Sequence, residues 1–259
     1  MKGFTILATY IFSMNFKKHI PNIFTLGNLL CGTLATVLAV SGYFEMTALF
    51  VVLGIFLDFF DGFFARIFKV SGELGKQLDS LADMVTSGVV PGIVLFILLG
   101  NNQQIPYEIN TEFKVSMGLP LIGLLVTLAA CYRLAKFNLD TRQSESFIGL
   151  PTPAMSLFIV SLPLVQMHSD VDFVKDLIGN NYFLIGIAIL FSFLMNSELS
   201  LFSLKFKNYS IKENLFKYIL ITLSIVLIVA FEYLSVPIII MSYILLSILN
   251  NFKNTDIQN

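Results

Sequence analysis

The sequence has no tryptophan, only two cysteines and two histidines among 259 residues, and charged residues make up just 13% of it. A soluble domain carries about a quarter charged residues, whereas this chain is 56% hydrophobic with a mean hydropathy of +0.81. We therefore expect an integral membrane protein. The net charge of −1 and the lack of a dense basic block argue against nucleic acid as a partner. Cys31 and Cys131 lie within apolar runs, so we interpret both as small core residues rather than a disulfide or metal site.

Apolar runs long enough to approach the width of a bilayer recur along the chain. A hydrocarbon core about 30 Å thick requires about 20 apolar residues per helix. Eight candidate spans follow, at 22–42, 44–66, 76–99, 115–136, 150–167, 181–197, 217–234 and 236–250. Only a short turn separates the last two, which are also open to interpretation as one kinked or re-entrant unit. The expected fold is an all-α, polytopic bundle of about eight transmembrane helices.

The same pattern suggests a division of the chain. We expect an N-terminal interfacial segment at 1–20, a core with six helices at 21–216, and a C-terminal helical pair with its tail at 217–259. The first residues have a second interpretation, as an upstream extension of a chain that starts at Met14. Small residues in the first span permit close helix packing.

Basic residues are distributed unequally between the two ends of these spans. Two of the 16, Lys114 and Lys175, fall on one side, which is otherwise acidic. The other 14 fall on the opposite side: Lys2, Lys17, Lys18, Arg66, Lys69, Lys76, Arg133, Lys136, Arg142, Lys205, Lys207, Lys212, Lys217 and Lys253. The positive-inside rule makes the basic side cytoplasmic. We therefore expect both termini in the cytoplasm and the protein in the cell (inner) membrane.

Four aspartates stand at fixed spacing where the second span ends and the third begins. The pattern is D-x-x-D-G-x-x-A-R-x8-G-x3-D-x3-D, and its residues are Asp58, Asp61, Gly62, Ala65, Arg66, Gly75, Asp79 and Asp83. Helical spacing places the first two aspartates on one face and the last two on another. Ionisable groups in or beside a bilayer cost several kcal/mol and indicate function by default.

Four carboxylates in one volume repel one another, and a divalent cation with oxygen ligands relieves that repulsion. The alternative is a structural network of salt bridges, but Arg66, Lys69 and Lys76 are too few to neutralise these acids together with Glu73. The salt-bridge alternative also leaves the small residues on the same faces unexplained. The sequence therefore predicts metal-assisted chemistry at the cytoplasmic membrane surface.

This pattern resembles, position for position, the signature of the CDP-alcohol phosphatidyltransferases, membrane enzymes of phospholipid synthesis. The resemblance implies two divalent cations, Mg²⁺ or Mn²⁺, held by the four aspartates, with Asp83 also acting as general base. It further implies that Gly62, Ala65, Arg66 and Gly75 bind the CDP group. Thr25 and Asn28, one turn apart on the first helix, are additional CDP-binding candidates; their alternative role is to join helices by hydrogen bonds.

Three further stretches narrow the resemblance. They are P-N-x-x-T-x-x-N-L-x-x-G from Pro21, R-L-A-K-F-N from Arg133 and F-x-G-L-P-x-P-A from Phe147. Together they are similar to the membrane-integral phosphatidylserine synthases, over about residues 21–196, except that Lys136 replaces a common arginine. That similarity implies CDP-diacylglycerol and L-serine as substrates, residues 21–216 as the catalytic core, and a homodimer whose interface is not located. Arg133, Lys136 and Asn138 are then candidates for binding the serine carboxylate or a lipid phosphate, with cytoplasmic anchoring as the alternative.

Other functions remain open from the sequence. Related enzymes use glycerol 3-phosphate or an inositol phosphate as acceptor, and these dianions require a more basic pocket than Arg133 and Lys136 provide. An ion-coupled transporter also uses carboxylates within the membrane, but near its midplane and between repeats, whereas these acids lie at one boundary. A non-catalytic metal-binding scaffold is the third alternative. Asn196 and Glu198, which end the sixth predicted span, are possible neighbours of the site without an assigned role.

Overall fold

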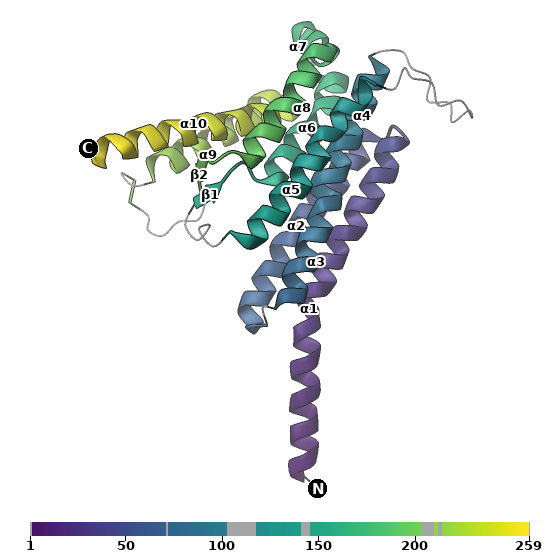
Figure 1. Cartoon of the computed structure of the whole chain (residues 1–259), viewed down its shortest axis with the longest axis vertical. Coiled ribbons are helices and arrows are strands. Elements are labelled where there is room, and N and C mark those ends of the chain that lie inside the picture. The colour runs from purple at the N-terminus through teal and green to yellow at the C-terminus, as the bar shows by residue number, and fades with distance from the viewer. Residues whose placement is uncertain are drawn as a thin grey trace.

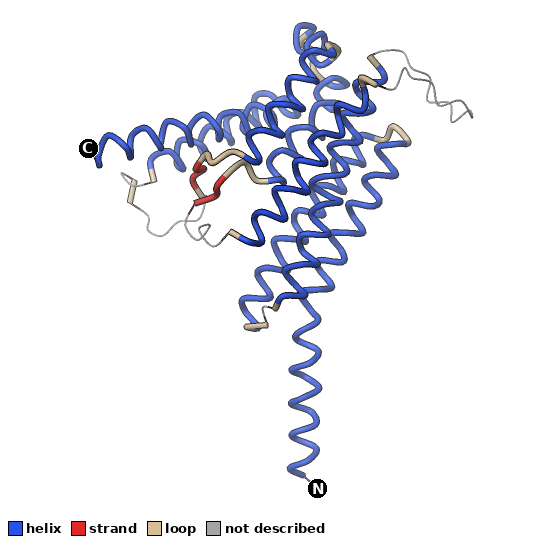
Figure 2. The backbone as a smooth tube through the Cα atoms, viewed as in Figure 1, coloured by secondary structure: helices blue, strands red, loops and turns tan. Residues whose placement is uncertain are grey.

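The structure is a computed structural model that describes residues 2–70, 72–102, 118–140, 146–203, 210–211 and 214–258. Within these ranges the chain is a bundle of helices with one small sheet (Figures 1 and 2). The first half contains α1 (Lys2–Val40), α2 (Phe44–Phe68), α3 (Glu73–Asp83), the π-helical turn η1 (Met84–Val89), α4 (Val90–Asn101), the 3-10 turn η3 (Pro120–Leu124) and α5 (Leu125–Leu139). The second half contains β1 (Ser146–Ile148), α6 (Thr152–His168), α7 (Asp172–Ile178), α8 (Asn181–Asn196), β2 (Ser200–Phe202), α9 (Leu215–Phe231), the 3-10 turn η4 (Glu232–Leu234) and α10 (Ser235–Gln258).

The helices confirm an all-α integral membrane protein, but not the predicted number of spans. Five helical stretches of the described chain are long and apolar enough to cross a membrane: His19–Val40, Phe44–Phe68, Glu73–Asn101, Pro120–Leu139 and Leu215–Phe252. A sixth arises if α7 and α8, bent by 68° at their junction, count together. Helix α6 has only 17 residues, about 26 Å at 1.5 Å per residue, which falls short of a bilayer core about 30 Å thick.

The two ends of the chain differ from the central bundle. Helix α1 is continuous from Lys2 through Pro21 and projects beyond the other helices toward the N-terminus (Figure 1). Helices α9 and α10 pack against each other and run across the bundle rather than along it. The break between them is at Glu232, whose φ is +43°. The division of the chain into three parts remains a prediction.

Small residues allow α1, α2 and η1 to pack closely. A Cβ at Gly32 of α1 would lie 2.3 Å from Thr86 Oγ1, and a Cβ at Gly54 of α2 would lie 2.8 Å from Thr86 Cγ2. Helix association in a bilayer depends on such packing because lipid is as apolar as the side chains. Gly32 therefore serves packing within the chain. Of the two cysteines, Cys31 is buried as expected, whereas Cys131 is exposed, so the core interpretation was wrong for Cys131.

The F-x-G-L-P-x-P-A stretch joins α6 to the end of α8. Gly149 has φ +75°, and a Cβ there would lie 2.3 Å from the carbonyl oxygen of Met195, so both its conformation and its space require glycine. Its N–H donates to Leu199 O at 2.8 Å, and Leu150 N–H donates to Leu194 O at 2.9 Å. Strands β1 and β2 then pair antiparallel, with Phe147 opposite Leu201. The motif thus fixes the segment that follows α8.

Candidate active site

The four aspartates come from two helices joined by a short turn. Lys69 adopts a left-handed conformation at the end of α2, with φ +54°, and only residues 69–72 separate α2 from α3. Asp58 and Asp61 lie near the end of α2, and Asp79 and Asp83 lie in the last two turns of α3. This end of the bundle is the one from which the N-terminal part of α1 projects (Figure 1).

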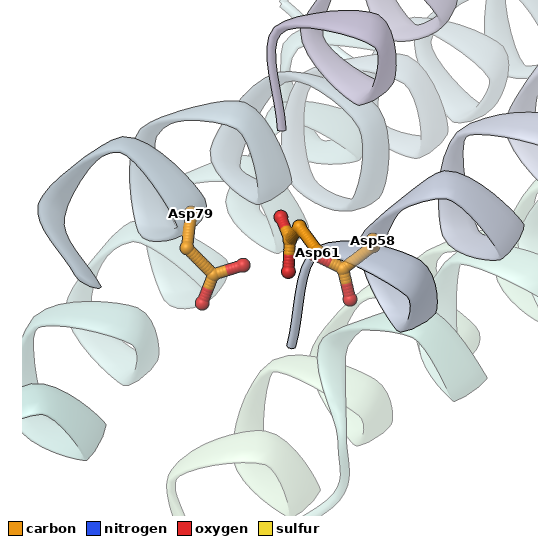
Figure 3. A group of neighbouring side chains, drawn as sticks. All are labelled: Asp58, Asp61 and Asp79. Carbon is orange, nitrogen blue, oxygen red and sulfur yellow. The ribbon is translucent and has the colours of Figure 1, made fainter. Parts of the chain in front are cut away.

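Three of the four carboxylates form a compact group. Asp58, Asp61 and Asp79 each offer an oxygen, and these atoms all lie within 4.8 Å of one another. Figure 3 shows Asp79 pointing from its helix toward Asp58 and Asp61 on the facing one. Asp83 is one turn beyond Asp79, and its charge also acts on Asp58. The helical spacing therefore brings the predicted acids together as expected, with Asp83 adjacent to the compact group.

The donor set fits a hard divalent cation. Such ions bind carboxylate oxygens, and the three grouped aspartates supply them without a neutralising cation in the same group. Asp58 Oδ1 is buried and has no hydrogen-bond partner among the described residues. A buried acceptor of this kind is costly unless something occupies it. An unpaired carboxylate oxygen of this kind is available to bind a metal ion.

Thr25 and Asn28 of α1 hydrogen-bond two of the aspartates. Thr25 is only 3% exposed, and its hydroxyl donates to Asp61 Oδ2 at 2.6 Å. Asn28 is fully buried, and its amide donates to Asp83 Oδ1 at 3.1 Å. Hydrogen bonds of this kind fix the orientation of carboxylate ligands. In this structure the two predicted nucleotide-binding residues are thus occupied in orienting acids, and their contact with CDP remains a prediction.

Thr86 extends this network and was missed by sequence reasoning. Its hydroxyl lies 2.7 Å from Asn28 Oδ1, to which it donates, so the Asn28 amide group is oriented with its NH₂ toward Asp83. Thr86 belongs to η1, the π-helical turn that begins immediately after Asp83. Turns of this type occur often at functional sites. The sequence does not indicate this role, because Thr86 is a single threonine in an apolar run. The role becomes visible only in the structure, where Gly32 and Gly54 pack against Thr86.

The other predicted CDP-binding residues are less tightly packed than Gly32. A Cβ at Gly62 would meet nothing closer than 3.9 Å, and a Cβ at Gly75 nothing closer than 3.7 Å. Packing alone therefore does not require glycine at either position, in contrast to Gly32. Ala65 is half-buried and Arg66 is exposed on the same end of α2. The role of these four residues in binding CDP remains a prediction.

Arg133 is the most buried basic group at this end of the bundle among the residues described. It is 6% exposed, its Nε has no hydrogen-bond partner, and its guanidinium lies 5.6 Å from the centre of the Phe137 ring. It also interacts electrostatically with Asp83 of α3 and with Tyr243 of α10. A buried guanidinium with an unpaired N–H can accommodate an anion. Sequence reasoning did not identify Tyr243 as a neighbour of Arg133, because it lies within the last apolar helix and belongs to no recognisable motif.

Lys136 and Asn138 point to different neighbours. Lys136 Nζ forms an ion pair with Glu198 Oε1 at 2.8 Å. The Asn138 amide donates to Ser80 Oγ at 2.9 Å, and its backbone oxygen accepts a hydrogen bond from Lys76. Asn138 is therefore attached to α3, one residue from Asp79. The structure places all three predicted acceptor-site residues at the end of α5, and Arg133 is the one described above as interacting electrostatically with Asp83.

Comparison with known proteins gives one consistent result. The sequence model of the CDP-alcohol phosphatidyltransferase family matches residues 18–248. The chain is 35% identical over 150 residues to a CDP-diacylglycerol–serine O-phosphatidyltransferase of Bacillus subtilis, covering 56% of this chain and 75% of the relative. It is 32% identical over 219 residues to the protein of that name from Helicobacter pylori, covering 83% and 84%. An archaetidylserine synthase of Methanothermobacter thermautotrophicus is 28% identical over 168 residues, covering 61% and 65%.

Proposed function

Because the chain belongs to the CDP-alcohol phosphatidyltransferase family, and is a transferase of phospholipid synthesis, we propose that it transfers the phosphatidyl group of CDP-diacylglycerol to the hydroxyl of L-serine. The products are phosphatidylserine and CMP. The observation that carries this proposal is the group of three carboxylates beside Asp83, supported by relatives named for the serine reaction over most of the chain.

Asp58, Asp61, Asp79 and Asp83 would hold two divalent cations, Mg²⁺ or Mn²⁺. When bound, such ions supply charge neutralisation for a diphosphate and for a departing nucleotide. Thr25 and Asn28 keep Asp61 and Asp83 in fixed orientations, so little reorganisation accompanies binding. Gly62, Ala65, Arg66 and Gly75 provide the space and the positive charge beside the acids for the CDP group.

Asp83 would take the proton of the serine hydroxyl as that oxygen attacks the phosphorus. Its carboxylate lies at the end of α3, held by Asn28 and attracted by Arg133. Removal of the proton by a positioned base contributes about 10²–10⁴-fold to the rate. Arg133 and Lys136 would bind the serine carboxylate or a lipid phosphate, with Asn138 as a neutral neighbour.

The distribution of basic residues supports a cytoplasmic site in the cell (inner) membrane, with both termini in the cytoplasm. We further propose that residues 21–216 form the catalytic core, that residues 1–20 lie at the membrane interface, and that residues 217–259 are an accessory helical pair. The functional unit would be a homodimer.

Release of CMP in detergent micelles tests the proposal directly. The purified protein, supplied with CDP-diacylglycerol and Mg²⁺ or Mn²⁺, should release CMP with L-serine and much less with glycerol 3-phosphate or an inositol phosphate. A preference for glycerol 3-phosphate would assign a different acceptor within the family. Metal binding without CMP release from any acceptor would instead support the non-catalytic scaffold.

A further inference from the structure

The ion pair between Lys136 and Glu198 presents both charges of an amino acid side by side. Lys136 Nζ and Glu198 Oε1 lie 2.8 Å apart, and the side chains are 36% and 60% exposed. An exposed pair of this kind contributes little to stability. Its location is more informative, since Lys136 is one helical turn from Arg133, the buried cation that interacts electrostatically with Asp83. Serine carries a carboxylate and an ammonium, so a site that recognises it requires both a cation and an anion.

The segment that carries Glu198 is held in place by its neighbours on both sides. Gly149 N–H donates to Leu199 O at 2.8 Å, and Asn251 of α10 donates to Ser200 O at 2.7 Å. Further along, Tyr243 donates to Phe202 O at 3.1 Å. Glu198 is therefore not on a free surface loop: β1, β2 and α10 fix the backbone next to it. Fixed backbone around a charged side chain is what preorganised binding requires.

Two unpaired buried atoms lie in the same region. Asn196 donates through its NH₂ to Ala129 O and Ser192 O, both at 3.1 Å, which settles the orientation of its amide. Its Oδ1 is buried without a hydrogen-bond partner among the described residues, and so is the Nε donor of Arg133. Ala129 is one turn before Arg133 on α5. An unused acceptor two residues before Glu198 and an unused donor three residues before Lys136 therefore belong to the same two segments as the ion pair, which suits a ligand with one positive and one negative group.

We propose that Glu198 binds the α-ammonium group of the acceptor, with Asn196 Oδ1 as a neutral acceptor beside it, while Arg133 and Lys136 bind the carboxylate. This inference rests on the proposed serine function. The amino acid would exchange the Lys136–Glu198 contact for two contacts of its own, one to each partner. The hydroxyl is then the group left to face Asp83. The site would select amino acids over acceptors that carry a phosphate or a carboxylate alone.

Glu198→Gln tests the assignment, because it removes the charge and keeps the shape. A matched control is Glu45→Gln, since Glu45 is 58% exposed and also forms a 2.8 Å pair, with His168. Glu45 is near the start of α2, 13 residues and about 20 Å from Asp58. In Glu198→Gln the KM for serine should rise about 5- to 10-fold, somewhat less than for the loss of a buried charge-assisted contact, because the site is partly solvated. The KM for CDP-diacylglycerol and the control variant should be unchanged.

Two inhibitors separate the contribution of the ammonium group to acceptor binding from the contribution of the carboxylate. L-Alanine retains both charges of serine and lacks the hydroxyl, whereas propanoate retains the carboxylate alone. In the wild-type enzyme alanine should compete with serine better than propanoate does, and Glu198→Gln should remove most of this difference. If Glu198 only competes with the substrate for Lys136, its replacement should lower the serine KM and make propanoate a stronger inhibitor. That result would overturn the proposal.

The remaining outcomes are also decisive. An unchanged serine KM in Glu198→Gln, or an equal rise in the KM for CDP-diacylglycerol, refutes the role of Glu198 and leaves the serine reaction intact. Absence of serine-dependent CMP release from the wild-type enzyme refutes the proposed function itself, and this inference with it.

Discussion

The hydrogen bond from Thr25 to Asp61 should determine how tightly the acidic centre, formed by Asp58, Asp61, Asp79 and Asp83, binds the divalent cation that we propose for it. Thr25→Val keeps the branched shape of the side chain and removes only the hydroxyl. The single hydroxyl hydrogen has two candidate acceptors, Asp61 Oδ2 at 2.6 Å and Pro21 O at 3.2 Å. The shorter contact, to a charged oxygen, is the stronger one. The substitution therefore leaves Asp61 without its donor from α1.

The magnitude follows from the burial of both groups. Thr25 is 3% exposed and Asp61 is 7% exposed, so water screens their contact little. A hydrogen bond to a charged group contributes about 1.5–3 kcal/mol, which corresponds to about 10- to 150-fold in an equilibrium constant. Loss of partners that orient metal ligands typically weakens metal binding by about 10–100-fold. We expect the concentration of Mn²⁺ for half-maximal activity to rise within this range, with turnover largely restored at saturating metal.

Two measurements check this expectation. The first is the Mn²⁺ dependence of CMP release, and the second is direct titration of bound Mn²⁺ by electron paramagnetic resonance in detergent. Thr33→Val is the matched control, because Thr33 lies on the same helix, is exposed, and donates only to Leu29 O at 2.8 Å. If Thr25→Val leaves Mn²⁺ binding unchanged and raises the KM for CDP-diacylglycerol instead, Thr25 contacts the nucleotide and the orienting role is refuted.

Three other substitutions address the base, the metal ligands and the packing. Asp83→Asn should lower turnover by about 10²–10⁴-fold with little change in the KM for CDP-diacylglycerol, because the attacking hydroxyl loses its base; turnover near that of the wild type would remove Asp83 from this role. Asp79→Ala should weaken Mn²⁺ binding and regain part of its activity in excess metal, and an unchanged metal dependence would contradict the metal centre. Gly32→Val should destabilise the fold by about 1–3 kcal/mol, measured as a lower thermal unfolding midpoint, since a Cβ would lie 2.3 Å from Thr86 Oγ1. Gly186→Ala, where a Cβ meets nothing within 4 Å, should show no such loss.

The acidic centre was predictable because its geometry is local. Residues three or four apart on a helix share a face whatever the rest of the fold does, so Asp58 and Asp61, and Asp79 and Asp83, were paired by spacing alone. The short turn between α2 and α3 then brought the two faces together. An all-α membrane bundle followed in the same way from the long apolar runs.

Features that depend on contacts distant in the sequence were not predictable. Spacing could not reveal that Thr86 reaches Asn28, 58 residues away, or that Lys136 pairs with Glu198, 62 residues away. The number of spans, predicted as eight, is not confirmed: hydropathy measures how apolar a run is, and it does not register the 68° bend between α7 and α8. The role of Gly149 likewise depends on the end of α8, which the motif itself does not contain.

The contacts made by α10 also bear on how the protein is synthesised. All four acids and their partners Thr25, Asn28 and Thr86 lie within the first 86 residues, so their hydrogen bonds can form while most of the chain is still on the ribosome. The backbone beside Glu198 acquires its last hydrogen bond only when Asn251 arrives. Chains emerge from the N-terminus at about 5–20 residues per second. A nascent chain can therefore form the hydrogen bonds around its four aspartates well before the backbone beside Glu198 gains its contacts to α10, and a truncated chain that lacks α10 would keep the hydrogen bond from Gly149 to Leu199 but lose the one from Asn251 to Ser200.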